Sequence, residues 1–247
     1  MSCEIREPGT ETMAPVLLLH GDSVRVWDPI SGVVAAAGHR VIAWEGTGNG
    51  HPDEASSVLA ALDELGVSAF HVVGHGTGAL TALHLARTAP ARALSCGVIA
   101  GHEAAPTGDA PAGVRLACPP ADPRRARAWA LERLSYTPHH IDDALLDAAV
   151  PPVAGCSGTL AAKDALYAHA RDHGFQVPIM LIWGSHDPLS EVERGVALFD
   201  LLASTTAPLS LHVVNRAGHF VFRERPREVL RLLLPFLARS ERPREGR

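Results

Sequence analysis

The sequence predicts an α/β fold in which a mostly parallel sheet is covered by helices on both faces. Short apolar runs alternate along the chain with longer segments whose apolar residues recur at helical spacing, and parallel strands joined by crossover helices produce this pattern. The short runs are almost continuously apolar, which is typical of strands buried on both faces. The chain has 247 residues, of which 47% are hydrophobic, so a single domain can bury a full core.

The first half of the chain contains three of the expected strands, at residues 16–19, 40–44 and 69–73. Helical spacing marks residues 27–37 and 53–65, which are followed by Gly38 and Gly66, and glycine is the usual residue just beyond a helix. The third strand enters a glycine-rich turn and continues into an Ala/Leu-rich helix at residues 77–88. Few residues precede residue 16, so no convincing strand is expected before it.

The second half of the chain combines further strands with an insertion. A fourth strand is expected at residues 93–100, and Pro, Ala and Gly are then abundant up to residue 123. Helical patterns follow near residues 123–134, 139–150 and 157–173, so we expect a helical cap at about residues 104–175, inserted into one domain that spans residues 1–247. Strands at residues 177–183 and 209–214, a helix between them at 191–203 and an amphipathic closing helix at 224–238 complete the pattern.

The composition argues against several classes of partner. The formal net charge is −5, whereas a nucleic-acid partner requires a clustered basic face. We expect no membrane segment, because no window is long and apolar enough to cross a bilayer. The N-terminal residues lack the charged start and apolar core of a secretory signal, and the four cysteines are scattered without paired spacing. Free thiols and a cytoplasmic location are therefore expected.

The most informative stretch is Gly74-His75-Gly76-Thr77-Gly78, which lies between the third strand and its helix. A strand, a sharp turn and a helix with small flanking residues form a nucleophile elbow, which lifts one central side chain above the end of a sheet. The central residue here is Gly76, and glycine adopts the strained backbone of such a turn freely. Other chemically active side chains also follow expected strands, where ligands of parallel sheets bind: His20, Glu45, His102, Asp187 and His219.

These landmarks, in this order, resemble those of the α/β-hydrolase superfamily, specifically its small cap-bearing esterases, haloperoxidase-like proteins and carbon–carbon hydrolases. The resemblance covers nearly all of residues 16–237 and rests on His20-Gly21, residues 45–50, the elbow at residues 74–78, and the loops with Asp187 and His219. It implies that Asp187 and His219 form a catalytic acid–base pair, and that the backbone amides of Asp22 and Thr77 form an oxyanion hole. We expect the substrate pocket to be lined by five residues, namely His20, Gly21, His75, His102 and Trp129.

At the position where such hydrolases carry a serine nucleophile, this chain carries Gly76, which closes the acyl-serine route. We expect an enzyme without a cofactor, in which His219, oriented by Asp187, activates water or removes a proton from a small carbonyl compound. This base would suit hydrolysis, carbon–carbon cleavage, elimination or cyclisation. One alternative is a catalytically silent protein that binds a small ligand or a partner through the same pocket. Another is a glycine introduced in place of serine to trap a bound substrate.

A metal site is not expected from the sequence. His169 and His173 are one helical turn apart, which is a spacing seen among metal ligands. However, no third ligand lies near them in the sequence, and zinc catalysis requires three protein ligands. Glu103, just after an expected strand, is a reserve candidate for the acid.

Overall fold

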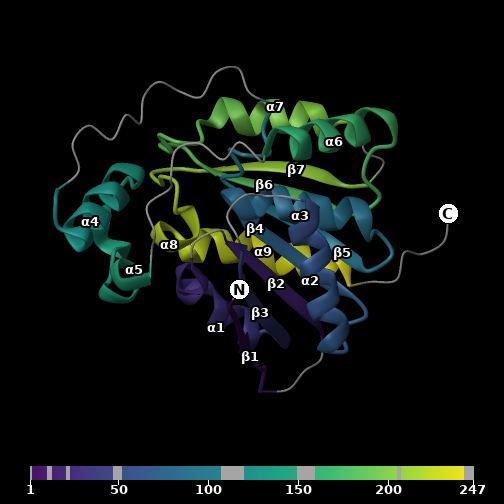
Figure 1. The fold of residues 1–247 in the computed structure, drawn as a ribbon, viewed down its shortest axis with the longest axis horizontal. Coiled ribbons are helices and arrows are strands. Elements are labelled where there is room, and N and C mark those ends of the chain that lie inside the picture. The colour runs from purple at the N-terminus through teal and green to yellow at the C-terminus, as the bar shows by residue number, and fades with distance from the viewer. Residues whose placement is uncertain are drawn as a thin grey trace.

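The structure is a computed structural model that describes residues 2–9, 13–20, 23–46, 52–106, 120–148, 159–204 and 207–241. These residues form a seven-stranded sheet with helices on both faces, in the strand order β1-β3-β2-β4-β5-β6-β7 (Figure 1). The pair β1–β3 is antiparallel and every other neighbouring pair is parallel, so the expected fold class is confirmed. The strands are β1 (Ser2–Arg6), β2 (Met13–His20), β3 (His39–Glu45), β4 (Phe70–His75), β5 (Ala93–Ile99), β6 (Ile179–Gly184) and β7 (Leu209–Val214).

Strand β1 corrects the expectation that no strand precedes residue 16. It lies at the edge of the sheet, where Cys3 and Ile5 are exposed and Glu4 and Arg6 are half-buried. An edge strand with charged side chains carries no continuous apolar run, so the pattern that marks the buried strands is missing from it. The next strand, β2, is also longer than expected, because it begins at Met13, three residues before the expected start.

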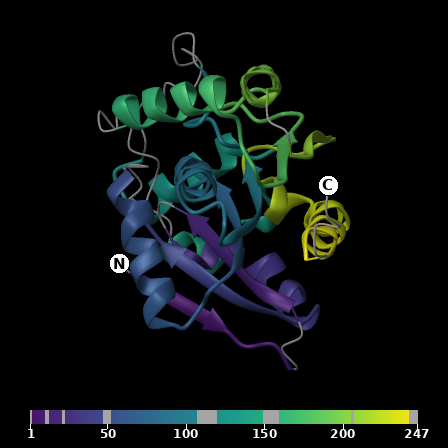
Figure 2. The same cartoon turned by 90° about the vertical axis from the view of Figure 1, so that its right-hand side faces the viewer.

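The two-residue period of the strands divides the buried side chains between two cores. Leu17 and Leu19 of β2 belong to one core, whose helices are α2 (Pro52–Glu64), α3 (Thr77–Thr88), α6 (Thr159–Asp172) and α7 (Val192–Leu202). Val16 and Leu18 belong to the other core, with α1 (Asp28–Ala36), α8 (Val221–Glu224) and α9 (Pro226–Ser240). Figure 2 shows α9 on the opposite side of the sheet from α2 and α3. No helix in the described ranges is both long and apolar enough to cross a membrane.

The insertion between β5 and β6 divides into two parts. Helices α4 (Pro123–Leu134) and α5 (Asp143–Ala148), with the short 3-10 helix η2 (Pro138–His140) between them, lie beyond one end of the sheet (Figure 1). Helix α6 instead packs against α3 and α7, and its Leu166 and Ala170 are buried in the same core as these helices. Residues 107–119 and 149–158, which the expected cap includes, lie outside the described residues.

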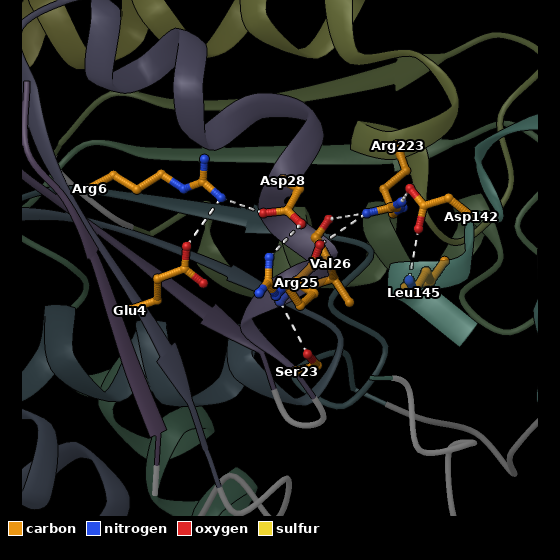
Figure 3. A network of polar contacts seen from close by, with 9 residues as sticks. All are labelled: Glu4, Arg6, Ser23, Arg25, Val26, Asp28, Asp142, Leu145 and Arg223. Atoms are coloured by element: carbon orange, nitrogen blue, oxygen red, sulfur yellow. Dashed lines mark hydrogen bonds and ion pairs between the residues drawn. The ribbon is translucent and has the colours of Figure 1, made fainter. Parts of the chain in front are cut away.

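Arg223 of α8 joins the inserted helices to the body of the domain (Figure 3). Its side chain is 2% exposed, and burial lowers its pKa, although Asp142 opposes that shift. The guanidinium group donates hydrogen bonds at 2.8–3.1 Å to four acceptors, namely the carbonyl oxygens of Arg25, Val26 and His140 and the carboxylate of Asp142. One buried cation therefore connects η1 (Val24–Trp27), the segment from η2 to α5, and α8.

Replacing Arg223 with Met should lower the free energy of unfolding by about 3 kcal/mol, because buried carbonyl groups lose a charged donor. Urea unfolding of the purified variant measures this loss. Arg25→Met is the matched control, since the Arg25 side chain is 54% exposed and lies 3.8 Å from Asp28. An exposed ion pair of this kind contributes roughly 0–1 kcal/mol. Equal losses in the two variants would contradict the role assigned to Arg223.

Candidate active site

The candidate site begins at the turn between β4 and α3. Gly76 has φ 56° and ψ −118°, a conformation that glycine adopts without the strain that a side chain would bring. Its neighbours are glycines for a different reason. A Cβ on Gly74 would collide with the carbonyl oxygen of Gly78, and a Cβ on Gly78 would collide with that of Leu19 in β2. The glycines therefore let α3 start directly against the ends of β2 and β4.

His219 and Asp187 form a buried, hydrogen-bonded pair. Nδ1 of His219 lies 2.8 Å from Oδ2 of Asp187. The other carboxylate oxygen, Oδ1, accepts the backbone amides of Leu189 and Ser190 at 2.9 and 2.8 Å. With the carboxylate held in this way, the neutral imidazole carries its hydrogen on Nδ1 and its lone pair on Nε2. The pair thus has the geometry of an oriented general base.

The Nε2 atom of this base lies close to Gly76. A Cβ built on Gly76 would be 3.8 Å from Nε2 of His219 and 3.7 Å from Cε1 of His102. A hydroxyl carried on that Cβ would come within the roughly 2.6–3.2 Å reach that a nucleophile needs from its base. Gly76 therefore stands where a nucleophilic side chain would face His219, and it leaves that place open.

The loop that carries His219 is held by the inserted segment and by Glu224. The backbone amide of His219 donates to the carbonyl oxygen of Leu134, at the end of α4, at 2.7 Å. The Glu224 carboxylate accepts the amide of Gly218 at 2.8 Å and the amide of Thr137 at 2.9 Å. Burial raises the pKa of Glu224, and the backbone donors oppose that shift. No sequence pattern marks Glu224, because its partners are backbone amides from two distant segments.

The rings of His20, His75 and His102 gather around His219. His20 and His75 are stacked with centroids 5.0 Å apart, His75 lies 4.6 Å from His219, and His102 lies 5.3 Å from it. His75 also donates from Nε2 to the carbonyl oxygen of His219 at 3.1 Å. Trp27, which the sequence analysis did not single out, makes edge contacts with His20 and His75. His20, His75 and His102, which are expected to line the substrate pocket, thus lie near His219.

The histidines behind the base remain uncharged at neutral pH. Burial, followed by the charges of His219 and Arg223, lowers the pKa of His20 to about 3. Burial is also the main reason why the pKa of His75 lies well below its ordinary value. Burial and the charge of Arg223 lower the pKa of His140, the last residue of η2, to about 4. Because His20 and His75 carry no charge, they do not repel the positive charge that His219 would gain on accepting a proton.

Glu103 does not contact His219 or Asp187 in the described structure. Its carboxylate lies 3.4 Å from Nε2 of His102 and 3.2 Å from Nζ of Lys163. The hydrogen bond with His102 is the largest reason why the pKa of Glu103 falls to about 2, since burial acts in the opposite direction. Glu103 is thus a partner of His102 in this structure, whereas Asp187 is the carboxylate that is hydrogen-bonded to His219.

The remaining expected site residues lie in different surroundings. Thr77 is the first residue of α3, so its amide belongs to the helix N–H groups that have no partner within the helix. Trp129 is half-buried on α4 with the Arg133 guanidinium 4.5 Å from its ring, and among the described residues no ring contact joins it to the four histidines. Gly21 and Asp22 lie outside the described residues, so the second oxyanion donor stays a prediction.

A mostly parallel sheet with a strand–turn–helix of this kind, faced by a His–Asp pair, defines the class of α/β-fold hydrolases. A comparison with protein-family models agrees, because the model described as "Alpha/beta hydrolase family" matches residues 16–232. The chain belongs to the alpha/beta hydrolase family.

Two relatives illustrate how far the similarity extends. "Putative carbamate hydrolase RutD" of Variovorax paradoxus (strain S110) is 28% identical over 246 residues, which cover 90% of this chain and 90% of that protein. "Monoacylglycerol lipase ABHD6" of Homo sapiens is 32% identical over 76 residues, which cover 31% of this chain and 21% of that protein. The first similarity therefore extends over nearly the whole chain, and the second over less than a third of it.

Solved structures share the fold at low sequence identity. A meta-cleavage product hydrolase of Pseudomonas fluorescens IP01 (CumD) has a TM-score of 0.76 at 17% identity, covering 96% of this chain and 94% of that one. A monoacylglycerol lipase of Paleococcus ferrophilus has a TM-score of 0.73 at 18% identity, covering 97% of this chain and 100% of that one. At these identities the likeness shows the shared architecture.

The buried histidines predict a specific dependence of stability on pH. Unfolded histidines titrate near about pH 6.5, whereas His20, His75 and His140 have lower pKa values in the folded protein. The unfolded chain therefore takes up more protons as the pH falls. The stability that these histidines contribute is fully present above about pH 6.5, and it is lost below that value by up to about 1.4 kcal/mol per pH unit for each histidine.

Urea midpoints measured from about pH 7 down to about pH 4.5 test this dependence. His140→Gln removes one histidine whose pKa is lowered in the folded protein, so the pH profile of this variant should be shallower than that of the unmodified protein. A profile that is flat over this range, or one that the substitution leaves unchanged, would contradict the assignment.

Proposed function

We propose that this chain is a cofactor-independent enzyme that hydrolyses a small carbonyl compound, with His219 and Asp187 activating a water molecule directly. The observation that carries the proposal is the 3.8 Å between Nε2 of His219 and the point where a side chain on Gly76 would begin. A base held by a buried carboxylate faces a position without a side chain. A water molecule takes the place of a hydroxyl there and is the group from which the base removes a proton.

In the proposed reaction, Nε2 of His219 takes a proton from water while the water oxygen bonds to the substrate carbonyl carbon. Asp187 stabilises the imidazolium that results. The carbonyl electron pair moves onto oxygen beside the Thr77 amide at the start of α3, with the Asp22 amide as the expected second donor. When the tetrahedral adduct collapses, the bond to the leaving group breaks and His219 returns its proton to that group. No covalent bond to the protein forms.

The surroundings of His219 support its proposed role as a general base. His20 and His75 carry no charge at neutral pH, since burial lowers the pKa of each, so no positive charge on these two rings opposes the imidazolium. The amide of His219 is bound to Leu134 of α4, which fixes the backbone, and Asp187 orients the ring. A base that is already aligned does not lose alignment entropy during the reaction.

A carbamate or an ester is the substrate class that we infer. The relative named as a carbamate hydrolase is similar over 90% of the chain, and a carbamate offers a carbonyl carbon to an activated water. Carbon–carbon cleavage, elimination and cyclisation require the same base, and the shared fold of a meta-cleavage product hydrolase gives a reason to include a vinylogous 1,5-diketone among the test substrates.

The second candidate function is ligand binding without turnover. Gly76 favours it, because a glycine at φ 56° relieves the strain of the turn, and strain of this kind costs about 1–3 kcal/mol. A silent binding protein would keep that gain and lose nothing by lacking a nucleophile. The intact pair of His219 and Asp187 favours the enzyme, since binding alone does not require an oriented base.

Turnover of activated carbamates, esters, thioesters and a vinylogous 1,5-diketone by the unmodified chain and by His219→Ala tests the proposal. We expect His219→Ala to lower turnover of the accepted substrate by about 10²–10⁴-fold, the usual contribution of general base catalysis. Pre-steady-state traces of the unmodified chain should show no burst of the first product, because no acyl-enzyme accumulates.

Gly76→Ser and Gly76→Ala form a matched pair that separates the mechanisms. Both place a Cβ at the strained turn, where it meets His102 and His219 only at ordinary contact distance, but only serine adds a nucleophile. The proposal expects Gly76→Ala to lower turnover by filling the place of the water, and Gly76→Ser to give a burst. Turnover unchanged by His219→Ala, or a burst in the unmodified chain, would overturn it. Silence of the unmodified chain together with activity of Gly76→Ser would establish the binding protein instead.

A further inference from the structure

Three ligand-type side chains meet at the end of the sheet opposite the candidate active site. His39 is the first residue of β3, His71 is the second of β4, and Glu241 directly follows α9. One potential ligand atom from each lies within 4.8 Å of the others. The side chain of His71 is fully buried and that of Glu241 is 22% exposed, so the cluster is enclosed by the protein but is reached from solvent on the Glu241 side.

Hydrogen bonds already orient these side chains. Nδ1 of His39 lies 2.7 Å from the carbonyl oxygen of Ala14, so its N–H donates there and Nε2 keeps the lone pair. Nδ1 of His71 lies 2.8 Å from Oγ of Ser95. Oε1 of Glu241 lies 3.0 Å from Nε2 of His71 and accepts the Ala14 amide at 2.7 Å. Histidines that bind metals almost always have such an outer partner on the second ring nitrogen.

We propose that His39, His71 and Glu241 bind a divalent transition metal ion, with zinc as the best fit. Two imidazoles and one carboxylate form a donor set that zinc accepts, and the fourth position of the tetrahedron remains for water. Ligand atoms about 2.0–2.1 Å from a tetrahedral zinc lie roughly 3.3 Å from one another. The 3.0 Å between Nε2 of His71 and Oε1 of Glu241 is close to that spacing.

The same contact serves as a hydrogen bond when no ion is bound. Nε2–H of His71 then donates to Glu241, and the hydroxyl of Ser95 donates to Nδ1 of His71. Binding of the ion requires the hydrogen of the neutral ring to move to Nδ1, where Oγ of Ser95 accepts it. The ion then lies between Nε2 and the carboxylate, so Ser95 satisfies Nδ1 in both states, and neither state leaves a buried nitrogen unpaired.

Bound metal would connect the end of α9 to the sheet. His39 lies in β3 and His71 lies in β4, the two strands that flank β2. Glu241 is 170 residues away from His71 along the chain. The unfolded chain does not hold these three residues together. At a free zinc concentration 100 times the Kd, binding to the folded state alone lowers the unfolding equilibrium constant about 100-fold.

Titration of the full chain, after treatment with a chelator, with Zn²⁺ in a calorimeter and with Co²⁺ in a visible spectrophotometer tests the proposal. We expect one ion per chain, the visible bands of tetrahedral Co²⁺ and a zinc-dependent rise in the thermal midpoint. His39→Gln and Glu241→Gln should each weaken binding at least tenfold. His173→Gln is the matched control, because it makes the same substitution in a different histidine pair. His169 and His173 form that pair, with ring centroids 5.5 Å apart.

Glu241→Gln keeps an oxygen that accepts the Ala14 amide, so this variant should unfold in chelator at nearly the same temperature as the unmodified chain. Loss of the zinc effect in that variant then reports the ligand and not the fold. Failure of the unmodified chain to bind zinc stoichiometrically would overturn the proposal. Undiminished affinity in both His39→Gln and Glu241→Gln, or loss of binding in His173→Gln, would do so as well. None of these measurements depends on catalytic turnover.

Discussion

The close packing of α3 against β2 and β4 is the constraint on which the candidate site depends. Gly74 and Gly78 have no side chains at the points where the helix meets the strands, so the first turn of α3 lies at the ends of both strands. That contact places Gly76 and the Thr77 amide beside His20 and His75, the last residues of β2 and β4. A helix start displaced by the width of one methyl group would separate these groups from His219.

The position of the His219 imidazole depends on contacts that come from other parts of the chain. Asp187 orients the ring of His219, Leu134 binds its backbone, and Glu224 binds the amide of the preceding Gly218. Arg223, adjacent to Glu224 in α8, connects the inserted segment to η1. Two adjacent charged residues thus hold both the loop that carries His219 and the inserted segment bound to Arg223.

Much of the fold could be predicted because buried parallel strands are continuous apolar runs and the helices between them are periodic. Strand β1 was missed since its edge position requires no such run. The sequence predicts that Gly76, Asp187 and His219 follow strands, and the structure brings these residues together. Arg223 and Glu224 gave no signal, because a buried charge is distinguished from a surface charge only by distant partners. The same reason hides His39, His71 and Glu241, which no local spacing connects.

The hydrogen bond between Leu134 and His219 has a consequence for how a substrate would enter. Leu134 is the last residue of α4, and its carbonyl oxygen accepts the His219 amide at 2.7 Å. An outward swing of α4 would break this bond and release the backbone of the base loop. Entry through such a movement and alignment of the imidazole could not occur at the same moment. A substrate that entered past α4 would therefore meet an aligned imidazole only once α4 had returned and the Leu134–His219 hydrogen bond had re-formed.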